Sequence, residues 1–303
     1  MRSGFFGKVF SALMLCMALL MAVDPALAAV EPIPLDILQH GNPPHKSGWI
    51  SETEYEDESI HIVMDSARRK PKTSHGQTTC RWVRIKIADP SQLRTALSND
   101  SYDDPSLARS VSMAKAVNAV VAMNGDFCKY NYNRGYVVRQ GVFYRDALDG
   151  SRDVLIVDDK GDFSFVKKAT SEDMRQKNAE LEEAGRTVVN AFCFGPVLVA
   201  DGEVQDTVFP EMESNLATQR IALCQLGELE YAVMEIDGGN GYGMSLNELA
   251  TYITIIFPEC KVAYNMDGGG STHLIVNGKL VHKTANSRAI SDIVYFASAA
   301  SEE

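Results

Sequence analysis

The chain has 303 residues, of which 45% are hydrophobic and 23% are charged, a composition that excludes disorder as the default state and suits one large core or two modest ones. Its formal net charge of −11 removes the electrostatic basis for nonspecific binding to nucleic acid or to anionic lipid. Any anionic ligand must therefore be held by a local site.

The first 28 residues have the pattern of a secretory signal peptide. Arg2 and Lys8 precede an apolar run over residues 9–23, and Ala-Leu-Ala at 26–28 resembles a cleavage site. The run is shorter than the roughly 20 residues that a spanning helix needs, which disfavours a membrane anchor. We expect a secreted or extracytoplasmic mature protein without stable membrane insertion.

Cleavage after Ala28 leaves five cysteines, at positions 80, 128, 193, 224 and 260. An oxidising compartment permits up to two disulfides among them. Because the chain has neither a CxxC pair nor the Cys/His spacing of a zinc site, structural zinc is not expected. The simplest interpretation of most of the five is a small buried hydrophobic residue.

Residues 29–77 are expected to form an N-terminal arm before one domain over residues 78–303. The arm holds several prolines, the acidic stretch SETEYEDES and the basic stretch RRKPK, with IHIVM as a strand-like run. Charge runs of this kind usually mark a solvated face. The domain opens with a strand in which Val83, Ile85 and Ile87 alternate with polar residues.

A helix is expected after Asp104, which is placed to cap it, with Pro105 at its first position. It leads into VVAMNGDFC, a short buried strand that ends at Asn124-Gly125-Asp126. Strand-like stretches follow, with a polar helix among them over residues 172–184.

The last third predicts a strand over 229–237, a helix over 246–257 and a strand over 261–267. Ser245 and Glu248 form a capping box for this helix, and HLIVNGKLVH predicts a hairpin with an Asn-Gly turn. The lengths are those of a crossover unit, which would lay the two strands parallel and side by side. Asp237 and Asp267 would then end neighbouring strands at the edge of the sheet where ligands collect.

These elements predict an α+β fold. We expect a single mixed sheet in one domain, with helices packed on the sheet, after the signal peptide and the short arm.

Two acid-glycine motifs, EIDGG at 235–239 and NMDGGGS at 265–271, follow predicted strands. Most such tripeptides are turns without chemistry, but an ordinary turn needs one glycine and not three. Successive backbone N–H groups in a glycine loop can hold an anion, and Asp267 would stand beside it as base or nucleophile.

Three further residues have a structural and a functional interpretation. Arg220 and Arg288 are either solvated arginines or partners of a phosphate, which the planar guanidinium binds well. His273, two residues after the glycine loop, is more often structural than catalytic in such a position.

Five blocks, in order, resemble one known family: VAMNGDF, FGPVLVADGEV, TQRIALC, EIDGGNGYGMSLNELA and AYNMDGGGSTHLIVNGKLV. They are similar to the phosphodiester glycosidase family, which includes the uncovering-enzyme catalytic domain, over residues 80–297. The resemblance implies a hydrolase that cleaves a sugar-1-phosphodiester of the GlcNAc-alpha-1-phosphate type between the anomeric carbon and the phosphate oxygen. A glycan or cell-envelope polymer, such as an exopolysaccharide, is the implied carbohydrate substrate.

Most of the residues that we expect to act in the site stand at positions that match the family motifs; Asp126 and His273 do not. Asp267, Asp237 and Asn124 are the expected catalytic residues. Substrate binding is expected at Gly125, Asp126, Arg220, Gly238, Gly268, Gly269, Gly270, Ser271, His273 and Arg288. The family commonly has NGGFF where this chain has NGDFC, so Asp126 is expected to alter substrate choice and Cys128 is a candidate reactive thiol, against the simpler interpretation of a buried cysteine.

Three alternatives stay open from the sequence. A divalent cation between Asp237 and Asp267 would use the same two acids, although no cofactor is otherwise predicted. A noncatalytic protein that binds anionic glycan or builds an envelope or coat layer could have the same fold. Transfer of the glycosyl group to a second sugar is a third alternative.

Overall fold

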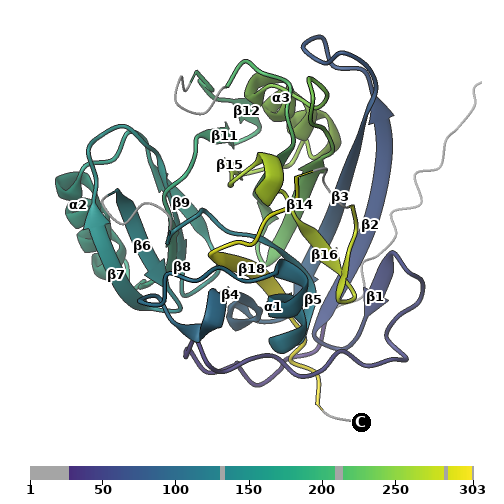
Figure 1. Ribbon diagram of the computed structural model, residues 1–303. Coiled ribbons are helices and arrows are strands. Elements are labelled where there is room, and N and C mark those ends of the chain that lie inside the picture. Colours follow the sequence, from purple (N-terminus) through teal and green to yellow (C-terminus); the bar gives the residue numbers. More distant parts are fainter. Residues whose placement is uncertain (1–26, 130–133, 209–213, 283–285, 302–303) are drawn as a thin grey trace, which may run out of the picture.

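The computed structural model describes residues 27–129, 134–208, 214–282 and 286–301 (Figure 1). The expected signal peptide therefore lies almost wholly outside the described residues. Within them, no helix combines the length and apolar character needed to cross a membrane.

Most of the described secondary structure is β, in three antiparallel sheets. The large sheet has, in spatial order, β1 (Glu54–Glu56), β2 (Ile60–Arg69), β3 (Thr78–Ile87), β14 (Glu230–Ile236), β13 (Arg220–Gly227), β15 (Val262–Asn265), β11 (Val197–Ala200) and β12 (Glu203–Val204). The second has β7 (Val142–Ala147), β6 (Gly135–Arg139), β10 (Val188–Phe192), β8 (Val154–Asp158) and β9 (Phe163–Val166). The third has β17 (Lys279–Leu280), β16 (Leu274–Val276), β5 (Ala119–Asn124), β18 (Asp292–Ala297) and β4 (Leu93–Leu97).

The three sheets share one core, and each carries one helix on its other face. The largest apolar cluster takes side chains from all three sheets, for example Val83, Val121 and Leu155. The helix α1 (Ser110–Ala116) packs on the third sheet, α2 (Ser171–Glu183) on the second and α3 (Leu246–Ile256) on the large one, as Figure 1 also shows. Helices do pack on sheets as expected, but the single mixed sheet is wrong.

The predicted crossover unit differs in one respect from the structure. The strands β14 and β15 do run parallel to one another, but β13 lies between them and is antiparallel to both. Asp237 and Asp267 therefore end strands at the same edge of the sheet, but these strands are not neighbours. The length of a crossover connection does not indicate whether another strand, here β13, lies between the two strands that it connects.

Local signals near the helix and hairpin ends were mostly correct. Ser245 and Glu248 make both bonds of the capping box, and Asn277 and Gly278 have positive φ angles in the turn between β16 and β17. The helix expected after Asp104 instead begins at Ser110. Asp104 accepts a hydrogen bond from the Ser106 N–H at 2.8 Å, and the following chain makes a β-bridge to Ile290 before the helix begins.

The segment expected to be an arm supplies two strands. β2 pairs with β3 over its whole length, from Ile60 opposite Ile87 to Arg69 opposite Thr78. The resulting hairpin extends past the rest of the large sheet in Figure 1.

Candidate active site

The two acid-glycine motifs approach the same short stretch of backbone. The start of β13 lies between the ends of β14 and β15, since Arg220 pairs with Ile236 and the Met266 N–H donates to the Ile221 carbonyl at 2.9 Å. Adjacent strands lie about 4.8 Å apart, so the ends of β14 and β15 are roughly 10 Å apart.

Gly238 and Gly268 are required by this close approach. A Cβ atom at Gly238 would lie 3.0 Å from the Gln219 N atom and 2.5 Å from the Tyr242 O atom, and one at Gly268 would lie 2.9 Å from the Gln219 O atom. The first glycine of each motif thus packs against Gln219, which no residue with a side chain could do without a shift. The glycine-rich motifs have a packing role, whatever they bind.

The loop was expected to bind an anion through the three backbone amides of Gly268, Gly269 and Gly270, but not all three are available. The Gly269 N–H donates to the Gln219 carbonyl at 3.1 Å, so this amide is used within the protein. A Cβ atom at Gly270 would lie 2.3 Å from the Asn286 O atom, so the loop also packs against the segment before Arg288. Of the three glycine amides, those of Gly268 and Gly270 donate to no acceptor among the described residues.

Asp267, Ser271 and Arg288 form one polar cluster. The Arg288 Nη2 lies 3.2 Å from the Asp267 Oδ2, and the Arg288 Nε donates to the Ser271 Oγ at 2.7 Å. The guanidinium lies over the Phe127 ring at 5.4 Å from the centroid. The side chain of Asp267 is 10% exposed whereas that of Arg288 is 50% exposed, so the guanidinium is accessible and its carboxylate partner is covered.

Asn124 holds the backbone under this cluster. Its Nδ2 donates to the Asp267 carbonyl at 2.8 Å, and its Oδ1 accepts the His273 N–H at 3.0 Å. These two hydrogen bonds are made to backbone groups on both sides of the glycine loop, and a third goes to the Gly125 carbonyl at 3.1 Å. This geometry positions Asp267 and leaves Asn124 buried.

Burial shifts the pKa values of two groups here. Desolvation raises the pKa of Asp267, against hydrogen bonds and charge from Ser271 and Arg288 that favour the carboxylate. Desolvation, with the positive charge of Arg288 adding to it, lowers the pKa of His273 to about 4. His273 is thus a neutral, buried imidazole, hydrogen-bonded to Ser287 at 2.8 Å.

Asp237 has a partner that the sequence analysis missed. The His282 Nε2 lies 2.8 Å from the Asp237 Oδ1, and the same oxygen accepts the Gly238 N–H at 2.7 Å. Both side chains are partly exposed, at 30% and 26%. No spacing signal in the sequence singles out His282, and its contact with Asp237 becomes visible only in the folded chain.

Arg220 lies at the base of the two loops, buried, and it donates to the carbonyls of Met244 at 3.3 Å and Leu216 at 3.2 Å. To contact a substrate as expected, the Arg220 guanidinium would have to share or give up these hydrogen bonds, which hold the loop before β13.

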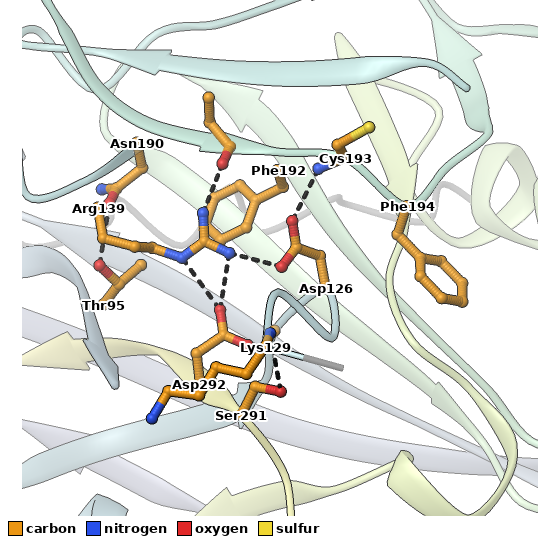
Figure 2. Close-up of polar contacts among 12 residues, drawn as sticks. Thr95, Asp126, Lys129, Arg139, Asn190, Phe192, Cys193, Phe194, Ser291 and Asp292 are labelled. Carbon is orange, nitrogen blue, oxygen red and sulfur yellow. Dashed lines mark hydrogen bonds and ion pairs between the residues drawn. The ribbon is translucent and has the colours of Figure 1, made fainter. Parts of the chain in front are cut away.

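A second polar cluster lies beneath loop 124–128 and is buried (Figure 2). Arg139 donates from Nη2 to Asp126 at 2.6 Å and Asp292 at 2.8 Å, and from Nε to Asp292 at 3.0 Å. Its Nη1 donates to the carbonyls of Val138 and Ala191, so all five guanidinium N–H groups have acceptors. Asp126 also accepts the Cys193 N–H at 2.7 Å. Both Asp126 oxygens are therefore bonded inside the protein, below the surface where we expected substrate contact.

Gly125 connects the two clusters. Its N–H donates to the Asp292 carbonyl at 2.9 Å and its carbonyl accepts the Asp267 N–H at 3.3 Å. A Cβ atom there would lie 2.1 Å from the Asp292 Oδ2. With one guanidinium for two carboxylates, burial and then the charge of Asp126 raise the pKa of Asp292 against the effect of Arg139.

The five described cysteines are free thiols and are buried. Burial raises the pKa of Cys128 well above its ordinary value, so this thiol lacks the thiolate character of a reactive cysteine. Cys128, Asp126 and Asp292 are close enough to one another to share a metal ion, but the Arg139 guanidinium already forms ion pairs with both acids.

The chain is similar to known proteins in sequence and in fold. A family model for phosphodiester glycosidases matches residues 117–297. The zebrafish N-acetylglucosamine-1-phosphodiester alpha-N-acetylglucosaminidase catalytic domain, auto-inhibited by its pro-peptide, is similar in structure with a TM-score of 0.62 and 15% identity, covering 85% of this chain and 87% of that one. A hypothetical protein from Synechocystis is similar with a TM-score of 0.54 and 14% identity, covering 78% of this chain and 62% of that one. No curated protein matches the chain in sequence.

Proposed function

The chain belongs to the phosphodiester glycosidase family, and from this premise we propose that it hydrolyses a sugar-1-phosphodiester between the anomeric carbon and the phosphate oxygen. The observation that supports this most is the half-exposed Arg288 guanidinium, held over Phe127 by Asp267 and Ser271. A planar guanidinium with open donors suits a phosphodiester.

In the proposed reaction, Arg288 and the Gly268 and Gly270 amides neutralise the phosphate. The C–O bond breaks and its electron pair stays on the phosphate oxygen, which leaves as a phosphate monoester. Because the second pKa of such a monoester is about 6, its departure needs little help from a general acid. Asp267, as carboxylate, stabilises the oxocarbenium-like centre or attacks it.

The Asp237–His282 pair is the proposed proton acceptor. A water molecule that attacks the anomeric carbon must lose a proton, and an imidazole hydrogen-bonded to a carboxylate is a suitable base. Its partly exposed position at the edge where both acid-glycine motifs lie supports this role. A divalent cation at Asp237 and Asp267 is the competing proposal, and activity lost with a chelator and restored by Mg²⁺ or Ca²⁺ would favour it.

GlcNAc-alpha-1-phosphodiesters are the first substrates to test, because the zebrafish relative is named for that linkage. We expect the protein without residues 1–28 to release phosphate monoester from at least one alpha-linked sugar in a panel, and Asp267→Asn to release none. Circular dichroism of both proteins checks folding. A secreted or extracytoplasmic location and an envelope glycan or exopolysaccharide as substrate are parts of the same proposal.

The alternative function is noncatalytic binding of an anionic glycan, which the exposed Arg288 would also serve. It predicts saturable binding, no turnover across sugars and metals, and unchanged affinity in Asp267→Asn. Appearance of a new glycoside only when a second sugar is added would instead indicate glycosyl transfer.

A further inference from the structure

A basic segment lies at the end of the β2–β3 hairpin, in a chain whose formal net charge is −11. It consists of Arg68, Arg69, Lys70 and Lys72, all exposed. Arg69 lies over the Tyr252 ring at 5.2 Å from its centroid, and in the described part of the chain none of the four forms an ion pair with a carboxylate. The sequence alone favoured a solvated face for these charges.

This end of the hairpin is fixed against the loop that follows Asp237. The His75 N–H donates to the Gly241 carbonyl at 2.9 Å, and the His75 ring meets the Tyr242 ring edge-on with centroids 6.2 Å apart. The Thr73 N–H donates to the Glu248 carboxylate at 3.0 Å, next to the first turn of α3. The basic segment is therefore held beside the proposed site.

A pocket of about 340 Å³ lies between the hairpin and the Asp237 loop. Arg68 and Thr78 line its hairpin side, and Asp237, Gly238 and Tyr242 line the other. Tyr242 is 43% exposed, so its ring offers a flat surface to a sugar or another ligand. The volume is within the range of small-molecule sites.

We propose that this pocket is a subsite for an anionic group on the aglycone, the part of the substrate that leaves with the phosphate. The inference rests on the proposed function. Arg288 takes the phosphodiester itself, and Asp237 lines the pocket, so the pocket lies next to the reacting centre. Arg68 would contact a second phosphate or a carboxylate of a polyanionic glycan, with Lys70 and Lys72 adding to the attraction.

The test compares substrates that differ only in the aglycone. GlcNAc-alpha-1-phosphodiesters with a neutral glyceryl, a phosphoglyceryl and a carboxylate-bearing aglycone are assayed with the wild type, Arg68→Ala and Arg84→Ala. Arg84 is the matched control, because it is also an exposed arginine of the hairpin but pairs with Glu259 and lines a different pocket. Thermal unfolding checks that all three proteins are folded.

We expect Arg68→Ala to lower the ratio of kcat/KM for a charged over the neutral aglycone by about fivefold to tenfold, since a charge-assisted contact is lost. The ratio should be unchanged in Arg84→Ala, and the effect should shrink at about 0.5 M salt. Which charged substrate responds more distinguishes a phosphate from a carboxylate subsite. Equal ratios in the wild type and Arg68→Ala would overturn the subsite while leaving the hydrolase proposal intact.

A binding measurement separates the two proposals. The probe is a non-hydrolysable phosphonate analogue of the phosphoglyceryl substrate, titrated by calorimetry. Weaker binding to Arg68→Ala than to Arg84→Ala, with no turnover of any substrate, would support the subsite and contradict the hydrolase. Equal binding to both variants would contradict the subsite even in an active enzyme.

Discussion

Loop 124–128 has an arginine–aspartate cluster on each side, and the two clusters differ in what they leave open. Below the loop, Arg139 is fully buried and its five N–H groups are satisfied by two carboxylates and two carbonyls. At the surface, Arg288 is half exposed and contacts one carboxylate and one hydroxyl. Residue type alone does not tell a ligand site from a scaffold; the number of donors still open to solvent does.

The largest effect should come from breaking the buried cluster. Arg139→Met leaves Asp126 and Asp292 as buried acids without their cation, and we expect a loss of about 3–5 kcal/mol in the free energy of unfolding. Urea unfolding measures it, with Arg84→Met as the exposed control, for which at most about 1 kcal/mol is expected. A similar small loss for both variants would mean that Arg139 does not hold the fold.

Removing the surface arginine should have the opposite pattern. Arg288→Ala is expected to lower kcat/KM by about 100-fold, because the transition state loses a charged donor, while the free energy of unfolding changes by less than about 1 kcal/mol. Arg288→Lys keeps the positive charge but lacks the planar guanidinium with its paired donors, so it should recover only part of the activity. Full activity in Arg288→Ala would show that the phosphate does not bind at Arg288.

The glycine that supports the upper cluster offers a third test. Gly268→Ala places a methyl group against the Gln219 carbonyl, and we expect a loss of about 1–3 kcal/mol in unfolding free energy. The φ angle of Gly268 is −108°, so positive-φ strain does not contribute. Gly185→Ala is the control, because it has backbone strain but no crowding: Gly185 has a φ of 70° and no atom within 4 Å of the added Cβ. Loss from Gly185→Ala alone would contradict the close-approach explanation.

The last expected effect concerns the pH dependence of stability. His273 has a folded-state pKa of about 4 against an ordinary value of 6.5, so the unfolded chain binds the proton more readily. Its contribution to stability is therefore present above pH 6.5 and is lost as the pH falls toward 4, by up to about 1.4 kcal/mol per pH unit. Urea unfolding between pH 7 and pH 4.5 should show a shallower slope in His273→Gln than in the wild type. Identical slopes would show that His273 titrates normally.

Most local features of the fold were predictable, whereas pairings between distant segments of the chain were not. The capping box of Ser245 and Glu248 and the Asn277–Gly278 turn depend on neighbouring residues, and both formed as expected. The position of β13 between β14 and β15 depends on pairing with two other strands, for which the length of the crossover carries no information.

The same limit applies to the site. The acid-glycine motifs marked Asp237 and Asp267 because each motif is contiguous in sequence. Asp126 was expected to contact substrate, because its partners Arg139 and Asp292 lie 13 and 166 positions away along the chain and nothing near Asp126 indicated them. His282 reaches Asp237 from a loop 45 positions downstream, and nothing in its own neighbourhood indicated that contact.

The most direct test of the account is phosphate-monoester release from GlcNAc-alpha-1-phosphodiester by the wild type, Arg288→Ala and Arg139→Met, each measured beside its unfolding curve. We predict that Arg288→Ala is folded and at least about 100-fold less active, whereas Arg139→Met loses activity only in proportion to its unfolded fraction. Turnover by folded Arg288→Ala at the wild-type rate would contradict the claim that the open arginine–aspartate pair is where the phosphodiester binds.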